Sequence, residues 1–199
     1  MPPAITAAVE GITDEAVVRR LFSHVRAVPG NVYVKQGKPS LRKRLAGYNH
    51  AARHAPWFIL VDLDRDADCA PPLRQEWLPQ PAPMGCFRVA VRAIEAWLMA
   101  DAEALARFLH VPKSRIPADP EALEDPKVEM VNLARQSRQK AITTDMVARQ
   151  RSGRAVGPAY ASRLIEYAHG PWRPDIAAQR ADSLARAIRA LRQLMDNCA

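Results

Sequence analysis

The chain has 199 residues, which is typical of one compact domain with at most a modest extension. Its hydrophobic fraction of 48% indicates a globular protein and excludes a disordered one. The formal net charge of +8 favours an anionic partner, with nucleic acid first, although a chain from an arginine-rich proteome would carry the same surplus as ordinary surface charge.

The cysteines and the N-terminus indicate the compartment. Cys69, Cys86 and Cys198 form no CxxC pair and no zinc spacing, and an odd count makes a poor disulfide framework. A reducing cytosol is the simplest interpretation, so we expect a cytoplasmic protein. The N-terminus lacks a basic segment before its short apolar run, and no stretch approaches the ~18 apolar residues of a membrane span. We therefore expect neither a signal peptide nor a membrane-spanning segment.

Strands and helices alternate in the first half of the chain. Short apolar runs predict buried strands, and apolar residues at helical spacing predict the helices between them. In chain order the pattern predicts strand 4–9, a helix capped by Thr13, strand 31–35, a basic helix over 40–54, strand 57–62, an acidic loop over 63–72, strand 86–91 and a helix over 93–109. This order predicts an α/β fold, a mostly parallel sheet sandwiched by helices.

The second half changes character, because no convincing strand follows residue 110. Helices are expected from Pro126, over 159–169 and, as one long amphipathic segment, over 176–195. The basic segment 138–157 is expected to be a loop, and the proline-rich segment 71–83 a surface connector. We predict two parts: an α/β core over 1–109 and a helical extension over 110–199 that packs on it.

Acidic residues follow three of the predicted strands. Glu10 follows the first, Asp62 and Asp64 follow the third, and Glu95 comes just after the fourth. All strands of a parallel sheet end at the same edge, so we expect these side chains to meet there. Asp14 lies one helical turn beyond Glu10 and can face the same point.

Carboxylates crowded together repel one another, and a cation is the natural neutraliser. Oxygen ligands favour Mg²⁺ or Mn²⁺, and two such ions can hold a phosphodiester for attack by water. A calcium-binding EF-hand loop starting at Asp62 is excluded, because its sixth and twelfth positions hold Ala67 and Leu73. A phosphatase with an aspartyl nucleophile is less favoured, because its acid pair usually follows the first strand.

The segments "VEGITDE" at 9–15 and "LVDLDRD" at 60–66 resemble the Toprim domain shared by topoisomerases, primases and the overcoming-lysogenization-defect nucleases. That domain has a glutamate after its first strand and a DxD pair after a later one, which together bind Mg²⁺. The resemblance assigns Glu10 to the glutamate and Asp62 and Asp64 to the pair. Asp14 stands where the nuclease branch often carries a second acid, more often Glu.

Two further segments, "RAIEAWLMAD" at 92–101 and the tail over 157–188, resemble a bacterial Toprim-like family catalogued as domain of unknown function 4276. This likeness covers nearly the whole chain. Activity in that family is inferred, so the resemblance implies fold with more force than function.

Basic residues provide candidate contacts to nucleic acid. Arg42, Lys43 and Arg44 lie in the basic helix, which is either a binding face or a solvated one. Lys127 and Lys140 are candidates for steadying a phosphate. The chain has no GxxxxGK[ST] motif, whereas related nucleases usually carry an ATPase, so the resemblance implies a separate ATPase partner or action without nucleotide.

The main hypothesis is a Mg²⁺-dependent (or Mn²⁺-dependent) nuclease or related phosphodiester enzyme, with a role in phage defence. Glu10, Asp62, Asp64 and Glu95 would be catalytic, and Asp14 would join Glu10 and the aspartate pair as a metal ligand. The alternative is a non-catalytic subunit of a defence or mobile-element system that binds nucleic acid or protein.

Overall fold

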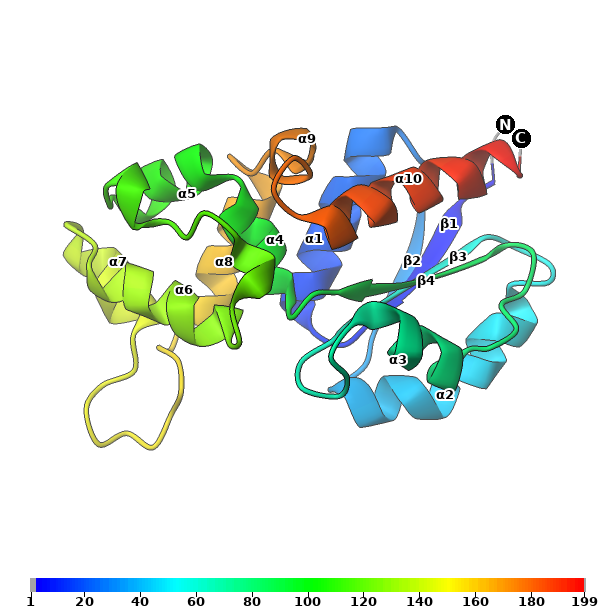
Figure 1. The fold of residues 1–199 in the computed structure, drawn as a ribbon, viewed down its shortest axis with the longest axis horizontal. Coiled ribbons are helices and arrows are strands. Elements are labelled where there is room, and N and C mark those ends of the chain that lie inside the picture. Colours follow the sequence, from blue (N-terminus) through cyan, green and yellow to red (C-terminus); the bar gives the residue numbers. More distant parts are fainter. Residues whose placement is uncertain (1–2, 199) are drawn as a thin grey trace.

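The computed structural model describes residues 3–198 and confirms the predicted α/β class. Four strands form a parallel sheet in the order β2-β1-β3-β4 (Figure 1). Their bounds are β1 Ile5–Val9, β2 Pro29–Val34, β3 Trp57–Asp62 and β4 Gly85–Ala90. In residues 3–198, no strand follows β4.

The central strand β3 shows why the sheet forms. Phe58 and Leu60 face one hydrophobic cluster, and Ile59 and Val61 face another on the opposite side. A parallel strand that is covered on both faces needs such a continuous apolar run, and this is the pattern of "WFILVD".

Helices cover both faces of the sheet (Figure 1). Helices α1 (Ile12–Val25) and α10 (Asp182–Asp196) lie on one face, and α2 (Lys38–Ala51) and α3 (Ala70–Trp77) lie on the other. The chain thus returns at its end to the face of the sheet that α1 covers.

The remaining helices gather beyond the carboxyl ends of the strands (Figure 1). They are α4 (Ile94–Ala100), α5 (Ala102–Leu109), α6 (Pro126–Arg135), α7 (Lys140–Met146), α8 (Tyr160–His169) and α9 (Pro174–Ala177), with short 3-10 turns η1 (Lys113–Arg115) and η2 (Pro120–Ala122). Helix α8 packs against α1, and one hydrophobic cluster runs from Ile5 to Leu194. The two predicted parts therefore share one core, and the boundary at residue 109 stays a prediction.

Two predicted long helices are each broken in the structure. The helix expected over 93–109 stops at Asp101, whose side chain accepts a hydrogen bond from Ala104 N–H at 3.2 Å and pairs with Arg173 at 2.7 Å. The helix expected over 176–195 is interrupted after α9, where Arg180 donates to the backbone carbonyls of Ala100 and Ala118. In both places a distant partner stabilises a bend that helical periodicity does not reveal.

Two segments expected to be irregular contain helices. The connector predicted over 71–83 begins with most of α3, whose prolines fall in the first turn, where no backbone donor is needed. The loop predicted over 138–157 contains α7, which buries Ile142 and Met146 one turn apart. Their tertiary contacts outweigh the local signals that favoured a loop.

Among residues 3–198, the structure contains no helix with the length and apolar character needed to cross a bilayer.

Candidate functional site

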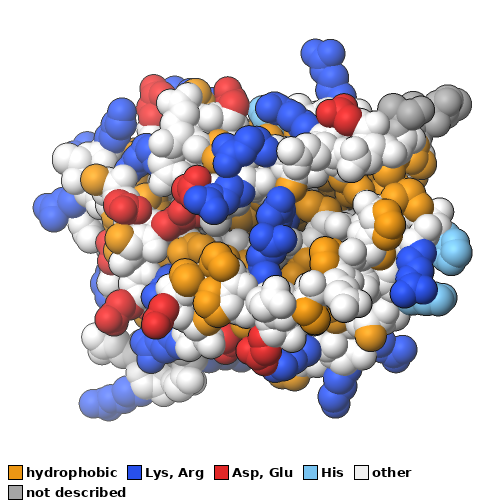
Figure 2. Space-filling model, turned by 45° about the vertical axis from the view of Figure 1, so that its right-hand side comes forward, with side chains coloured by type: hydrophobic (Ala, Val, Ile, Leu, Met, Phe, Trp, Pro, Cys, Tyr) orange, Lys and Arg blue, Asp and Glu red, His pale blue; other side chains and the backbone are white. Residues whose placement is uncertain are grey.

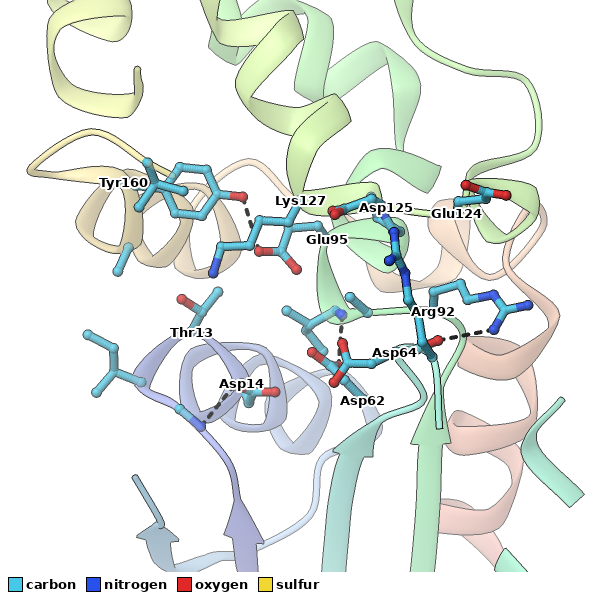
Figure 3. A pocket seen from close by; sticks show the side chains of 18 of the residues that line it. Thr13, Asp14, Asp62, Asp64, Arg92, Glu95, Glu124, Asp125, Lys127 and Tyr160 are labelled. Atoms are coloured by element: carbon cyan, nitrogen blue, oxygen red, sulfur yellow. Dashed lines mark hydrogen bonds between the residues drawn. The ribbon is translucent and has the colours of Figure 1, made fainter. Parts of the chain in front are cut away.

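The carboxyl ends of β3 and β4 open into a cavity of about 810 Å³ that α4, α6 and α8 close from the other side (Figure 3). Acidic side chains dominate its lining: Asp14, Asp62, Asp64, Asp66, Glu95, Glu124 and Asp125. Three cationic side chains also line it: Arg65, Arg92 and Lys127. The structure thus brings Asp14, Asp62, Asp64 and Glu95 to one place, as the strand-end argument predicted.

Glu10 lies directly behind this lining. Its Oε1 accepts a hydrogen bond from the backbone N–H of Asp62 at 2.9 Å. Asp62 Oδ1 in turn accepts from the N–H of Ile94, the first residue of α4, at 2.9 Å. The ends of β1 and β3 and the start of α4 are therefore joined through two carboxylates, and each carboxylate has a second oxygen that could bind another ligand.

Asp14 folds back onto the start of α1. Its Oδ2 accepts from the N–H of Gly11 at 3.0 Å, and its buried Oδ1 has no hydrogen-bond partner in the described part of the chain. Gly11, not the predicted Thr13, is the N-cap, and a Cβ at Gly11 would stand 3.0 Å from Asp14 Oδ2. The missing side chain at position 11 therefore allows Asp14 to take this place.

Glu95 is held by a tyrosine from the helical part of the chain. Its Oε1 accepts from the hydroxyl of Tyr160 at 3.0 Å, and both residues are buried (Figure 3). The Lys127 ammonium lies 5.8 Å from the centre of the Tyr160 ring. Helices α6 and α8 thus supply the surroundings of an acid that the α/β part carries.

Asp64 is already paired with a cation. Lys38 Nζ lies 2.6 Å from Asp64 Oδ2 and 2.8 Å from Asp66 Oδ2. The Asp64 backbone has a positive φ of 49°, and its N–H donates to the Arg92 carbonyl at 2.7 Å. This backbone turn aims the exposed Asp64 side chain at the first residue of α2.

The buried carboxyl groups of the site are weaker acids than usual, and burial is the main cause. It raises the pKa of Glu10, Asp14, Asp62 and Glu95, and repulsion among the carboxylates adds to it. Asp14 shows this with a pKa of about 7, and the pKa of Asp62 is raised well above its usual range. The cluster binds protons strongly when nothing else neutralises it.

The donor set suits a hard divalent cation. All candidate ligands are carboxylate oxygens, and Asp14 Oδ1 is an orphaned buried acceptor. As the side chains stand, no group of three or more Asp, Glu, His or Cys within residues 3–198 is arranged to hold a metal ion. A cation here would therefore need the carboxylates to rotate and Asp64 to part from Lys38.

Sequence reasoning missed several residues of the site. Lys38, Arg92 and Tyr160 come from parts of the chain that are far apart. Arg92 and Tyr160 lie in the two segments that resemble the Toprim-like family, but neither residue was assigned a role from the sequence. Of the two candidate lysines, Lys127 lines the cavity, and Lys140 begins α7 outside the lining. Lys38 precedes the helix predicted over 40–54, and only the structure places it at the first position of α2.

The basic helix α2 lies beside the site. Arg42 pairs with Glu76 at 2.6 Å and stacks over the Trp77 ring at 4.9 Å, so it joins α2 to α3. Lys43 and Arg44 are exposed. The assignment of these three residues to nucleic-acid binding stays a prediction.

Comparisons of the chain with protein-family models, with curated proteins and with solved structures found no match. The Toprim resemblance therefore also stays a prediction.

Proposed function

We propose that this protein is a Mg²⁺- or Mn²⁺-dependent nuclease, or a closely related phosphodiester hydrolase, of the Toprim kind. The observation that carries the proposal is the meeting of Asp14, Asp62 and Glu95 in one cavity, with Glu10 directly behind Asp62. Buried carboxylates with no cationic partner are costly to leave charged, which favours a bound cation.

Glu10, Asp14, Asp62 and Asp64 would hold the cation. When bound there, a divalent metal supplies Lewis-acid polarisation of a phosphate and lowers the pKa of a coordinated water. The chain's backbone donors, from Gly11, Asp62 and Ile94, fix the orientation of the carboxylates before any ligand arrives.

Glu95 is the candidate for proton transfer. Burial raises the pKa of its carboxyl group, which favours the protonated form, and the Tyr160 hydroxyl holds Oε1 in place. A protonated Glu95 can donate its proton to the oxygen that leaves when the phosphodiester is cleaved. Arg65, Arg92 and Lys127 line the same cavity and can bind the phosphate oxygens.

A basic loop supports nucleic acid as the substrate. Residues 147–159 form a loop that projects from the molecule between α7 and α8 (Figure 1). Gly157 ties its base to α7, donating its N–H to the Met146 carbonyl at 2.9 Å, and a Cβ at position 157 would collide with the α7 backbone. Arg149, Arg151 and Arg154 are exposed on the loop, while Val156, Gly157 and Pro158 line the cavity.

The net charge of +8 and the face shown in Figure 2 both suit a polyanionic partner. Lys and Arg side chains project from many parts of the face shown in Figure 2, and Asp and Glu are fewer. A phosphate backbone that follows the basic loop would reach the acidic cavity at the loop's base.

The direct test is cleavage of labelled DNA and RNA by purified protein, with Mg²⁺, with Mn²⁺ and with a chelator. We expect metal-dependent cleavage that Asp62→Asn reduces by at least roughly 100-fold. Asp68→Asn is the matched control, because Asp68 is an exposed acid in the loop after β3 and lies outside the cavity lining. Equal loss in both variants, or cleavage that survives Asp62→Asn, would contradict the proposal.

One observation favours a second candidate, a non-catalytic nucleic-acid-binding subunit. Lys38 pairs with both Asp64 and Asp66, so part of the acidic cluster has a cationic partner without a metal. This candidate predicts that the protein binds oligonucleotides with no cleavage under any metal. A defence role and a separate ATPase partner fit either candidate, and co-purification with an ATPase encoded beside this gene would support them.

A further inference from the structure

A second, smaller cavity of about 160 Å³ lies at the open edge of the sheet, along β4. The start of β4, the residues after α3 and the last turn of α10 surround it. It shares no lining residue with the acidic cavity, whose acids follow the opposite end of the strands.

Two arginines meet in this cavity. Arg88 comes from the middle of β4, and Arg74 comes from α3. The Nε of Arg88 is buried and has no hydrogen-bond partner within residues 3–198. A buried Nε–H without a partner is costly, because it has lost the hydrogen bond that it would make to water.

Among the described residues, 3–198, no Asp or Glu lines the cavity, so no carboxylate side chain there neutralises the two arginines. Cys86 also lines it, but burial raises the pKa of the thiol, so the sulfur carries no negative charge. Burial and then the nearby Arg88 lower the pKa of Arg74, as expected for two cations that face each other without an anion.

The shape of the donor set indicates the class of anion. Besides the two arginines, Gln193 from α10 and Asn197 just after it line the cavity, so polar residues from three parts of the chain meet there. A tetrahedral oxyanion can accept from several directions at once, whereas a planar carboxylate offers two oxygens. The volume is below that of pockets for drug-sized ligands and suits one small group.

We propose that Arg74 and Arg88 form a binding site for a single phosphate group, separate from the acidic cavity. The group is either inorganic phosphate or the terminal phosphate of a nucleic acid strand. Both present the same tetrahedral dianion to the arginines, and either would supply the anion that the lining of this cavity lacks.

The test is a titration of the full chain with inorganic phosphate in metal-free buffer. Calorimetry measures the binding, and the melting temperature is recorded at each phosphate concentration. Chloride at matched ionic strength is the reference. We expect saturable binding, a melting temperature that rises with phosphate, and a loss of affinity of roughly tenfold or more in Arg74→Ala and in Arg88→Gln. Arg107→Ala is the control, since this α5 arginine is 68% exposed and lies outside the cavity.

Arg74 is exposed on α3, so Arg74→Ala tests the site even if Arg88→Gln fails to fold. Absence of binding at millimolar phosphate, or binding that Arg74→Ala and Arg107→Ala weaken equally, would overturn the proposal. A short oligonucleotide, tested with and without a 5′-phosphate, separates the two sources. If the protein prefers the phosphorylated form and Arg74→Ala abolishes that preference, the site binds strand ends. If the protein binds both forms equally, the site binds free phosphate. Asp62→Asn should bind phosphate normally, so this test and the cleavage test can fail independently.

Discussion

The Glu10 carboxylate accepts a hydrogen bond from the backbone N–H of Asp62 at 2.9 Å, which ties the end of β1 to the end of β3. The contact has a structural role, because it satisfies a backbone donor at the edge of the sheet. It also places two acids of the candidate site side by side, 52 residues apart in sequence. Structural and chemical roles therefore overlap at Glu10, and the two can be separated by the choice of substitution.

Glu10→Gln and Glu10→Ala should differ in stability and agree in activity. Glutamine keeps an oxygen that can accept from Asp62 N–H, whereas alanine leaves this donor unsatisfied at a cost of about 1–2 kcal/mol in the free energy of unfolding. Both remove the negative charge, so both should lose metal-dependent cleavage. Urea denaturation and a cleavage assay on the same preparations check this. Full activity in Glu10→Gln would mean that the contact is structural alone.

Asp14 should make the metal-free protein less stable as the pH rises. Its pKa is 3.8 in an unconstrained chain and about 7 in the folded protein, because burial and then the charge of Glu10 disfavour the ionised form. Between these values the folded state holds a proton that the unfolded state has released. The free energy of unfolding should therefore fall by about 1.4 kcal/mol per pH unit from this group across the window, with no further change above it.

Denaturation of the wild type and of Asp14→Asn across this pH range measures that contribution. The asparagine variant should lose part of the slope and gain stability relative to the wild type at mildly alkaline pH. Mg²⁺ added there should stabilise the wild type more than the variant. Parallel pH profiles for the two proteins would contradict the assignment.

Tyr160→Phe should shift the pH dependence of cleavage. The Tyr160 hydroxyl donates to Glu95 Oε1 and lowers the pKa of that carboxyl, so its removal raises the pKa further. If Glu95 donates the proton, the alkaline limb of the pH–rate profile should move to higher pH. The cost in stability should be about 1 kcal/mol.

Tyr167→Phe is the matched control for that experiment. The Tyr167 hydroxyl is also buried, but it donates at 3.3 Å to the carbonyls of Leu98 and Asp101, away from the acids of the cavity. It should lose similar stability and leave the pH–rate profile unmoved. The same shift in both variants would show that loosened packing, not Glu95, causes it.

Lys38→Met should strengthen metal binding. Lys38 Nζ occupies Asp64 Oδ2 at 2.6 Å, and the half-buried ammonium competes with any cation for that oxygen. Its removal should tighten Mg²⁺ binding by roughly 3- to 10-fold, measured by calorimetry at mildly alkaline pH. Arg42→Ala breaks the neighbouring pair with Glu76 and should leave Mg²⁺ affinity unchanged. Weaker Mg²⁺ binding in Lys38→Met would favour the non-catalytic binding subunit.

The basic loop should contribute to nucleic-acid affinity through charge. Replacing Arg149, Arg151 and Arg154 together by glutamine should weaken oligonucleotide binding and reduce the slope of log affinity against log salt by roughly 2–3. A triple change at exposed arginines of α5 and α10, Arg107, Arg186 and Arg189, is the control. Fluorescence anisotropy at several salt concentrations measures both slopes, and equal slopes would remove the loop from the interface.

The amino-acid pattern predicted the central sheet well because each of its strands is a short apolar run that must be buried. The same logic predicted that Glu10, Asp62 and Glu95 lie near one another, since parallel strands end at one edge. It failed at Asp101, where helical periodicity continues through a residue that pairs with Arg173 across the molecule. Helix α3 was missed because its prolines favour a connector, although the buried Leu73 holds it as a helix.

By itself, the sequence determined the α/β class, the strand order along the chain and the acids that stand at strand ends, because these depend on local polarity and on the geometry common to parallel sheets. The tertiary structure decided which side chains surround those acids. Lys38 on Asp64, Tyr160 on Glu95 and Arg74 beside Arg88 each join elements that only the packed core brings together. Contacts of that kind depend on how helices pack around the sheet, and no local pattern of residues records that packing.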